Sequence, residues 1–335
     1  MAIVVPGLTR LPVCAAMLGL WMAVSSPATA HAQVPAGVYP SRPVTMVVAF
    51  PPGGMTDIVS RALAKELSQS LGQAFIIENR AGVAGQVGTE YVAKQPPDGH
   101  TLLVGATGYV IAPAMKKVAY DPLKSLEPVA VLAKAPNLIV VHPGVPAKNL
   151  AEFLDWAKTQ DSIPFGTAGA AGSTHLGGEW LRKLTGYRFT HVPYKGAAPA
   201  TNDAVAGQIP MAVQDSMSVS AFITSARLRP IANMSAERSR LFPELPTLRE
   251  AGFKDFDVYT WLGLYAPAGT PGPVLALLNR EANRIMNSPE MTERLRQQYS
   301  EPMGVMDLAR TRAFVAAEVA KWKRVVVDTG VSAQE

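Results

Sequence analysis

The chain has 335 residues, of which 48% are hydrophobic and 17% are charged, and its formal net charge is +5 at pH 7. This length exceeds the size at which a single hydrophobic core stops growing, so we expect two domains, and the composition excludes a disordered protein. Because the lysines and arginines are spread out with no run of like charges, the sequence argues against a nucleic-acid-binding protein. A mild basic excess is compatible with small anionic ligands.

The N-terminal segment has the pattern of a secretory signal peptide, which we expect to span residues 1–32. Arg10 precedes an uncharged apolar stretch at 11–24, and small residues follow it up to Ala32. The apolar stretch is too short for a good membrane span. Cleavage after Ala32, with Ala30 as the next choice, would place the mature protein in the periplasm and lower its formal charge to +4.

Cys14, the only cysteine, falls inside this segment. The residues before it are not small, and it precedes most of the apolar stretch. We therefore interpret it as an ordinary signal-peptide residue and not as a lipid-attachment site. Its removal leaves no cysteine, which excludes disulfides, thiolate metal sites and a cysteine nucleophile in the mature protein.

From residue 44 onward, short β-branched runs alternate with helical periodicity. The run over 44–50 predicts a buried strand. The turn Pro51-Pro52-Gly53-Gly54 then leads into a helix from about Thr56, which Gly72 ends. Further strands in this part are expected over 74–78 and 101–104. The alternation predicts an open parallel sheet with helices on both faces.

The composition then shifts, and a second alternating unit follows. Tyr120-Asp121-Pro122 and Glu127-Pro128 are expected to break the chain before a strand over 138–142. The elements expected beyond it are helix 150–158, strand 163–165, helix 174–184 and strands 189–192, 211–214, 231–234 and 258–266. The C-terminal part is expected to be helical.

In that part, Thr270 is expected to cap a helix with Pro271 as its first residue, and Ser288-Pro289 repeats the pattern. The last helix has an apolar face formed by Leu308, Phe314, Val319, Trp322 and Val326.

The chain is expected to cross between the two units near residues 140 and 260. Two crossings form a hinge, and the units it joins can close around a ligand. We therefore predict an α/β protein in which lobe 1 contains residues 33–141 and 263–335 and lobe 2 contains residues 142–262.

The strongest local signal is Phe50-Pro51-Pro52-Gly53-Gly54-Met55-Thr56-Asp57, where a strand runs through a glycine turn into a helix. Glycines let the backbone approach a ligand, and the helix N-terminus offers unpaired N–H groups and the positive end of its dipole. Such a turn suits a carboxylate or a phosphate. Asp57 would repel that anion, so it either caps its own helix, holds ordered water or contacts a ligand amino group.

A second turn of this kind is Phe165-Gly166-Thr167-Ala168-Gly169-Ala170-Ala171-Gly172-Ser173-Thr174-His175. Its G-x-x-G-x-x-G spacing differs from the dinucleotide-binding G-x-G-x-x-G pattern. A small-residue turn for close packing is the structural alternative. Two such turns facing each other across a cleft, rich in donors and poor in charge, suit an anion with two negative ends.

Weaker candidates follow other strands. They are Thr107, Tyr109, Tyr194, Lys195 and Asp215, the last of which either lines the cleft or caps a turn. The mature histidines show no metal-ligand spacing, so we expect no metal and no cofactor.

No G-x-S-x-G elbow, H-E-x-x-H motif or Walker loop is present, so we do not expect an enzyme. A triad assembled from Ser173, His175 and Asp215 is the catalytic alternative.

These motifs resemble those of the extracytoplasmic solute receptors of tripartite tricarboxylate transporters, also called Bug receptors. The resemblance runs from Tyr39-Pro40-Ser41-Arg42-Pro43 to the C-terminal helix. Besides the two glycine turns, it rests on Asn79-Arg80-Ala81-Gly82-Val83-Ala84-Gly85, Pro97-Asp98-Gly99-His100-Thr101-Leu102-Leu103, Tyr120-Asp121-Pro122, the segment 191–199 and Ala266-Pro267-Ala268-Gly269-Thr270-Pro271.

The resemblance implies a two-lobe periplasmic-binding-protein (Venus-flytrap) fold whose glycine turns hold the carboxylates of a small organic solute through backbone N–H groups, hydroxyls and ordered water. Together with Thr107, the predicted ligand-binding residues are Gly53, Gly54, Met55, Thr56, Asp57, Thr167, Ala168, Gly169, Ser173, Thr174, His175 and Asp215. The resemblance also implies a large and a small integral membrane transporter subunit as partners. We expect the protein itself to be a monomer.

Met55 is bulky for its position, and with Tyr109 it leads us to expect an apolar or aromatic carboxylate in preference to citrate. The sequence leaves the ligand open between dicarboxylates, tricarboxylates, amino acids and aromatic acids. It also leaves open two other functions: a ligand-presenting sensor for a membrane signalling kinase, and an enzyme acting on a bound carboxylate.

Overall fold

The computed structural model describes residues 1–3 and 39–331. Apart from its first three residues, the predicted signal peptide, with Cys14 and the cleavage site near Ala32, lies outside the described residues. The strands are β1 (Val44–Val48), β2 (Phe75–Asn79), β3 (Thr101–Ala106), β4 (Leu126–Val141), β5 (Ile163–Thr167), β6 (Phe189–Pro193), β7 (Met211–Asp215), β8 (Arg229–Asn233), β9 (Tyr259–Pro267) and β10 (Glu301–Pro302). The helices are α1 (Met55–Leu71), the 3₁₀ turn η1 (Val83–Gly85), α2 (Gln86–Val92), α3 (Gly108–Met115), α4 (Leu150–Lys158), α5 (Ser173–Thr185), α6 (Ala197–Val205), α7 (Ser216–Thr224), α8 (Gly272–Met286), α9 (Pro289–Gln297) and α10 (Leu308–Thr329).

The strands follow the order β2-β1-β3-β9-β4-β7-β5-β6, and β8 and β10 also pair with β4. At one end β1 is parallel to β2 and β3, and at the other β5 is parallel to β6 and β7. In the centre, β9 is antiparallel to β3 and β4, and β4 is antiparallel to β7. The predicted open parallel sheet is therefore correct at the two ends and wrong in the centre. The alternation of strands and helices does not indicate the direction of the strands by which the chain passes between the two units.

β4 is a single strand of 16 residues that belongs to both ends of this arrangement. It pairs with β9 as far as Pro136, and from Asn137 onward it pairs with β7 and β8. The predicted break at Glu127-Pro128 is wrong, because Pro128 lies in β4 where the register against β9 shifts. A residue without an N–H group is tolerated at such an irregularity.

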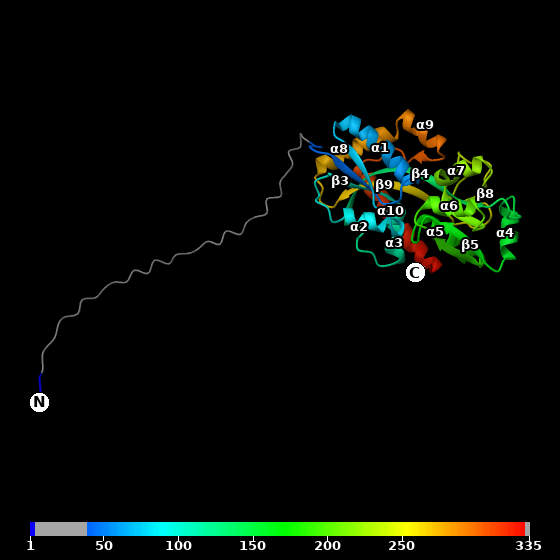
Figure 1. The fold of residues 1–335 in the computed structure, drawn as a ribbon, viewed down its shortest axis with the longest axis horizontal. Coiled ribbons are helices and arrows are strands. Elements are labelled where there is room, and N and C mark those ends of the chain that lie inside the picture. The colour runs from blue at the N-terminus through cyan, green and yellow to red at the C-terminus, as the bar shows by residue number, and fades with distance from the viewer. Residues whose placement is uncertain (4–38, 332–335) are drawn as a thin grey trace. The chain divides into compact units, whose positions relative to one another are not determined.

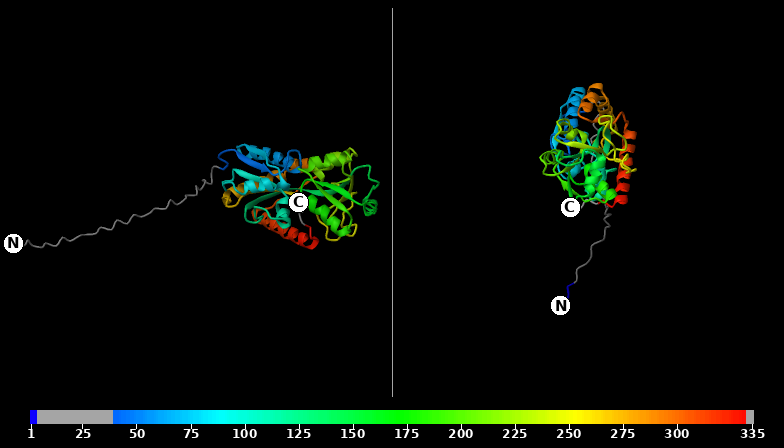
Figure 2. Two further views of the ribbon diagram at one scale, coloured as in Figure 1. Left: turned by 60° about the horizontal axis from the view of Figure 1, so that its bottom comes forward. Right: turned by 90° about the vertical axis from the view of Figure 1, so that its right-hand side faces the viewer.

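Two groups of elements lie on either side of the point where β4 changes partners (Figures 1 and 2). The first lobe, drawn in blue, cyan, orange and red, contains β1–β3, β9, β10, α1–α3 and α8–α10. The second lobe, drawn in green, contains β5–β8 and α4–α7. The N-terminal and C-terminal parts of the described chain thus build one lobe, and its middle part builds the other.

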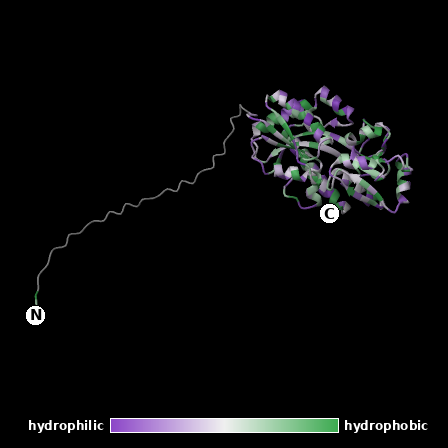
Figure 3. Ribbon diagram, in the orientation of Figure 1, coloured by the Kyte–Doolittle hydropathy of each residue, from purple (hydrophilic) through white to green (hydrophobic). Residues whose placement is uncertain are grey.

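Hydrophobic residues concentrate on the central strands, and hydrophilic residues lie along the outer helices (Figure 3). In the first lobe, Leu63 of α1 and Leu278 of α8 are fully buried in the same core cluster as Met46 of β1 and Leu102 of β3. This packing holds the start of α1 rigidly at the end of β1. Among residues 1–3 and 39–331, no helix combines the length and apolar character needed to cross a membrane.

Several helix ends follow local sequence signals. Gly72 ends α1 in the left-handed conformation (φ 69°), and Ser288 caps α9 by accepting the N–H of Met291, as predicted. The predicted cap of α8 is wrong by one residue: Pro271 takes the cap position, and the Thr270 hydroxyl donates to the carbonyl of Pro267.

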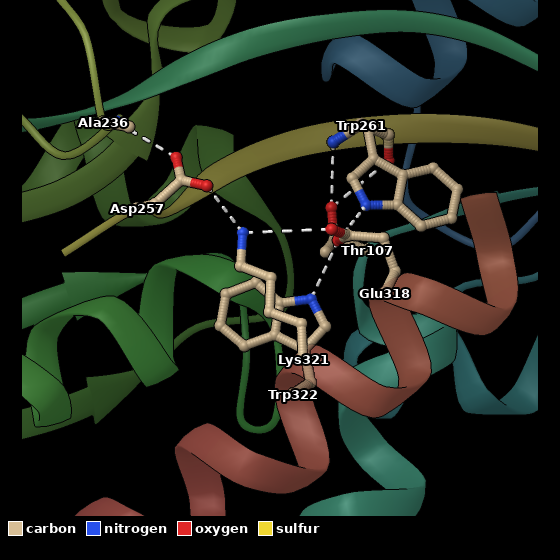
Figure 4. A network of polar contacts seen from close by, with 7 residues as sticks. All are labelled: Thr107, Ala236, Asp257, Trp261, Glu318, Lys321 and Trp322. Atoms are coloured by element: carbon tan, nitrogen blue, oxygen red, sulfur yellow. Dashed lines mark hydrogen bonds and ion pairs between the residues drawn. The ribbon is translucent and has the colours of Figure 1, made fainter. Parts of the chain in front are cut away.

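A buried polar network ties α10 to β9 (Figure 4). Glu318 of α10 is 6% exposed, and its Oε2 accepts the indole N–H groups of Trp261 (2.8 Å) and Trp322 (3.0 Å). Lys321, one turn later, forms an ion pair with Asp257 just before β9 (2.9 Å). α10 is therefore anchored to the segment by which the chain returns from the second lobe.

Candidate ligand-binding site

A cavity of about 70 Å³ lies where the two lobes meet, and both lobes contribute to its lining. Eight predicted binding residues line it: Gly54, Met55, Thr56, Ala168, Gly169, Ser173, Thr174 and Asp215. The structure does not place the other five on the lining: Gly53, Asp57, Thr107, Thr167 and His175.

Three helices begin at the cavity, α1 in the first lobe and α5 and α6 in the second. Their cap residues are Gly54, Gly172 and Gly196, and no side chain within the described part of the chain caps them. The first N–H groups of a helix have no partner inside it, so these groups are available to a ligand. By contrast, side chains of Asn149 and Asp307 cap α4 and α10.

Gly54 leaves space in front of the first of these helices. Its backbone (φ −87°, ψ 172°) suits any residue, and a Cβ atom added there would meet no atom within 4 Å. Neither strain nor packing therefore requires glycine at this position. A glycine here leaves room for a ligand to approach the N–H groups of α1 closely.

Asp215 is the only ionisable side chain on the lining, as far as the described residues show. Burial raises the pKa of its carboxyl group, while hydrogen bonds from the N–H (3.0 Å) and hydroxyl (2.8 Å) of Ser218 lower it, and the net direction is upward. These bonds also make Asp215 the cap of α7. It therefore both lines the cavity and caps a helix, the two roles that the sequence left open.

Asp57 stabilises the first glycine turn without lining the cavity. It is 3% exposed; its Oδ2 accepts from the Gly53 N–H (3.1 Å) and from Arg61 (2.9 Å), and its Oδ1 accepts from the Asn79 amide (2.9 Å). Burial raises the pKa of Asp57, but these hydrogen bonds and the charge of Arg61 lower it overall. Because Gly54 is the cap of α1, the predicted capping role of Asp57 is wrong, and its carboxylate instead fixes the turn.

Thr167 and His175 hold the second turn in a similar way. Thr167 Oγ1 accepts the N–H of Gly169 (3.3 Å) and lies 2.7 Å from His191 Nε2. His175 Nδ1 accepts the N–H of Ala171 (3.0 Å), and its ring stacks on His191 with the centroids 3.8 Å apart. The stacked rings therefore support the loop that carries Ala168, Gly169 and Gly172 to the cavity.

Both histidines of this stack are neutral at pH 7. Burial, and secondarily the charge of Arg182, lowers the pKa of His175 to about 4. Burial, and secondarily His175, lowers the pKa of His191 to about 3. The pair therefore acts as a set of fixed hydrogen-bonding groups and carries no positive charge to a ligand.

The remaining predicted side chains are engaged elsewhere. Thr107 Oγ1 accepts the N–H of Trp261 (2.8 Å) and joins the end of β3 to β9. Tyr109 is 2% exposed and donates to the carbonyl of Pro122, so it does not shape the lining together with Met55 as expected.

The catalytic and metal alternatives find no assembled site in the described chain. Ser173 contacts Thr260, His175 accepts from Ala171, and Asp215 accepts from Ser218, so the three candidate triad residues are not bonded to one another. Across residues 1–3 and 39–331, no group of three or more His, Cys, Asp or Glu side chains is arranged to hold a metal ion.

Several lining residues were not among the predicted ones. They include Pro51, Ala84, Gly108, Gly196, Ser218 and Thr260. Gly196 shows the same pattern as the two predicted turns, since it follows strand β6 and begins a helix, and that pattern could have identified it. Ala84 lies in a stretch with positive φ from Gly82 to Gly85, whose two glycines indicate a turn but not its place at the cavity.

Comparisons with known proteins agree with this geometry. The sequence profile of the tripartite tricarboxylate transporter family receptor matches residues 59–331. The periplasmic binding protein BugD is 34% identical (TM-score 0.83; 88% of this chain and 100% of that one). A Rhodopseudomonas palustris protein solved with adipate is 32% identical (TM-score 0.84; 88% and 99%), and MatC from the same organism, solved with malate, is 32% identical (TM-score 0.80; 86% and 100%). The chain therefore belongs to the tripartite tricarboxylate transporter receptor family, shares the two-lobe fold of its periplasmic binding proteins, and is a solute-binding receptor of that family.

Proposed function

We propose that the mature protein binds a small dicarboxylate between its lobes in the periplasm and presents it to the membrane subunits of a tripartite transporter. One observation carries this proposal: uncapped helix N-termini from both lobes, those of α1, α5 and α6, begin at one cavity. Two negative groups on one ligand can then each meet a helix N-terminus from a different lobe. The relatives solved with malate and adipate, both dicarboxylates, support this choice.

The size and charge of the cavity support a short diacid. A volume of about 70 Å³ corresponds to room for roughly five water molecules, which suits a short chain better than a tricarboxylate or an aromatic acid. No Lys or Arg side chain lies on the lining formed by the described residues. Backbone N–H groups therefore attract the carboxylates of the ligand. Because these groups have fixed positions, they favour a ligand whose two carboxylates lie at a matching distance.

The proposal includes export and domain closure. The signal peptide (1–32) is removed near Ala32. The lobes follow the expected division (33–141 with 263–335, and 142–262), with the two boundaries moved to Pro136 in β4 and Tyr259 in β9, where the strand pairing changes. β4 and β9 carry the crossings. Ligand drives closure because it binds the closed state more tightly than the open one. The closed monomer is the form that the large and small integral membrane subunits recognise.

A thermal-shift and calorimetry panel on residues 33–335 tests the proposal. The panel contains succinate, malate, adipate, aspartate, citrate, nicotinate and benzoate, applied after unfolding and refolding to remove co-purified ligand. A dicarboxylate at 100 times its dissociation constant should stabilise the protein by about 2.7 kcal/mol. Tighter binding of citrate or benzoate than of every diacid would contradict the proposed ligand class. Scattering curves unchanged by saturating ligand would contradict closure.

A further inference from the structure

One wall of the cavity consists of side chains that have no hydrogen-bond donor left to offer a ligand. It consists of Ser173, Asp215, Ser218 and Thr260, all of which line the cavity. Ser173 is 5% exposed, Asp215 7% and Thr260 8%. In such buried positions the direction of each hydrogen bond matters, because a buried donor or acceptor without a matching partner is costly.

The direction of the Ser173–Thr260 contact follows from its neighbour Asn137. The structure orients the amide oxygen of Asn137 toward Thr260, whose hydroxyl donates to it at 2.7 Å. A hydroxyl has one proton, so with the Asn137 amide in this orientation Ser173 is the donor in the contact between the two hydroxyls (2.9 Å). Ser173 therefore turns only its lone pairs toward the cavity.

The second part of the wall is limited in the same way. Ser218 donates its N–H to Asp215 Oδ1 (3.0 Å) and its hydroxyl to Oδ2 (2.8 Å). Asp215 is an acceptor at both oxygens, and the Ser218 hydroxyl has no proton left to donate. The side chains of Ser173, Asp215 and Ser218 thus form a wall of acceptors, whereas the donors on the lining are the backbone N–H groups at the starts of α1, α5 and α6, that of Ser173 among them.

We propose that this acceptor wall selects ligands that carry a hydrogen-bond donor in addition to their carboxylates, that is, hydroxy- or amino-substituted diacids. The inference rests on the proposed function, since it assumes that a diacid occupies the cavity. A carboxylate facing the wall would place acceptor against acceptor, and one wall group is itself a carboxylate. A hydroxyl or ammonium group facing it gives Ser173 and Asp215 the donor that they lack. Ser173 and Asp215 are then specificity-determining residues, and Thr260 and Asn137 position Ser173.

The test compares ligands that differ only in the donor. Calorimetry on residues 33–335 should show that malate or aspartate binds at least about tenfold more tightly than succinate. One additional hydrogen bond of about 1.4 kcal/mol corresponds to a tenfold change in the dissociation constant. Equal affinities would mean that a water molecule supplies the donor, and would overturn the inference while leaving the proposed function intact. Binding of no diacid at all would overturn both.

Two variants test the residues. Thr260→Val removes the acceptor that holds the Ser173 proton, so the freed hydroxyl can turn and donate to a carboxylate; the ratio of succinate to malate dissociation constants should fall toward one. Thr260→Ser, which keeps the hydroxyl, should restore the wild-type ratio. Should Thr260→Val fold poorly, Ser173→Ala provides the second measurement, because it removes one acceptor and should reduce the same ratio. An unchanged ratio in Ser173→Ala would overturn the assignment.

Discussion

Pro51 of the first lobe lies directly against Gly196 of the second. A Cβ atom added at Gly196 would stand 3.0 Å from Cγ and 3.2 Å from Cδ of Pro51. Both residues line the cavity, so the two lobes touch at its wall. A second contact supports it, because Ala84 of the first lobe lies against Gly169 of the second, where an added Cβ would be 3.5 Å from the Ala84 nitrogen. The absence of a side chain lets Pro51 approach Gly196 this closely, whereas an added Cβ at Gly169 would make an ordinary contact.

We expect Gly196→Ala to weaken ligand binding roughly tenfold or more, since a forced contact of this kind costs about 1–3 kcal/mol. The backbone of Gly196 (φ 111°) adds strain, so a control must separate strain from contact. Gly186→Ala is that control, because Gly186 also has a positive φ (71°) but an added Cβ there meets nothing within 4 Å. Calorimetry should show weaker binding for the first variant only. Equal losses in both would assign the effect to backbone strain.

Gly54→Asp is expected to abolish ligand binding, by at least about 100-fold, while the fold persists. The new carboxylate would cap α1 with its own side chain and place a negative charge where the ligand carboxylate binds. Since glycine is itself a fair cap, the free energy of unfolding should change by only about 0.5 kcal/mol. Gly272→Asp places the same charge in the first turn of α8, at an exposed site where an added Cβ meets nothing, and should leave binding unchanged. Undiminished affinity in Gly54→Asp would remove the first turn from the site.

The His175–His191 stack predicts acid sensitivity. Both folded-state pKa values, about 4 and about 3, lie below the ordinary value of 6.5 for histidine. The stability that the neutral pair contributes is therefore complete above about pH 6.5 and is lost as the pH falls toward these values. A shift of this size is worth on the order of 3 kcal/mol for one histidine. The charged neighbours on α5 are Arg182 and Glu179, which pair with each other at 2.7 Å.

Urea unfolding between pH 7 and pH 4 measures this effect. His191→Gln keeps a polar group near Thr167 but cannot gain a proton, so its free energy of unfolding should fall less steeply with acidification than that of the wild type. His142→Gln, which alters a half-buried histidine outside the stack that accepts the N–H of Gly144, should follow the wild-type slope. Parallel slopes for all three proteins would show that the stack does not govern the acid response.

Glu318 is expected to stabilise the folded protein, because it accepts hydrogen bonds from two buried indole N–H groups. Glu318→Leu leaves the buried N–H groups of Trp261 and Trp322 without their acceptor, at a cost of about 1–3 kcal/mol each. Glu318→Gln keeps an acceptor oxygen and should lose less. Urea unfolding followed by tryptophan fluorescence measures both variants. A Glu318→Gln variant as unstable as Glu318→Leu would show that the charge, and not the hydrogen bonds, stabilises the network.

The elements that could be predicted are those with a local cause. α4 begins and ends at the predicted residues, and α1 begins within one residue of its predicted start. β4 was misjudged because the place of Pro128 in a strand depends on the register of β9, more than 120 residues later in the chain. Residues far apart in the sequence also determine the surroundings of individual side chains. Asp57 accepts a hydrogen bond from Asn79, and His175 stacks on His191.

What the sequence determined by itself is the alternation of strands and helices and the two glycine turns that begin α1 and α5, because backbone preferences and helix starts depend on a few neighbouring residues. Only the tertiary structure decided which side chains face the ligand. Thr260 contacts Ser173 and Pro51 contacts Gly196 across separations of 87 residues and more. Whether a hydroxyl donates or accepts, and whether a carboxylate lines a cavity or supports a turn, is set by its neighbours in space, which local periodicity does not encode.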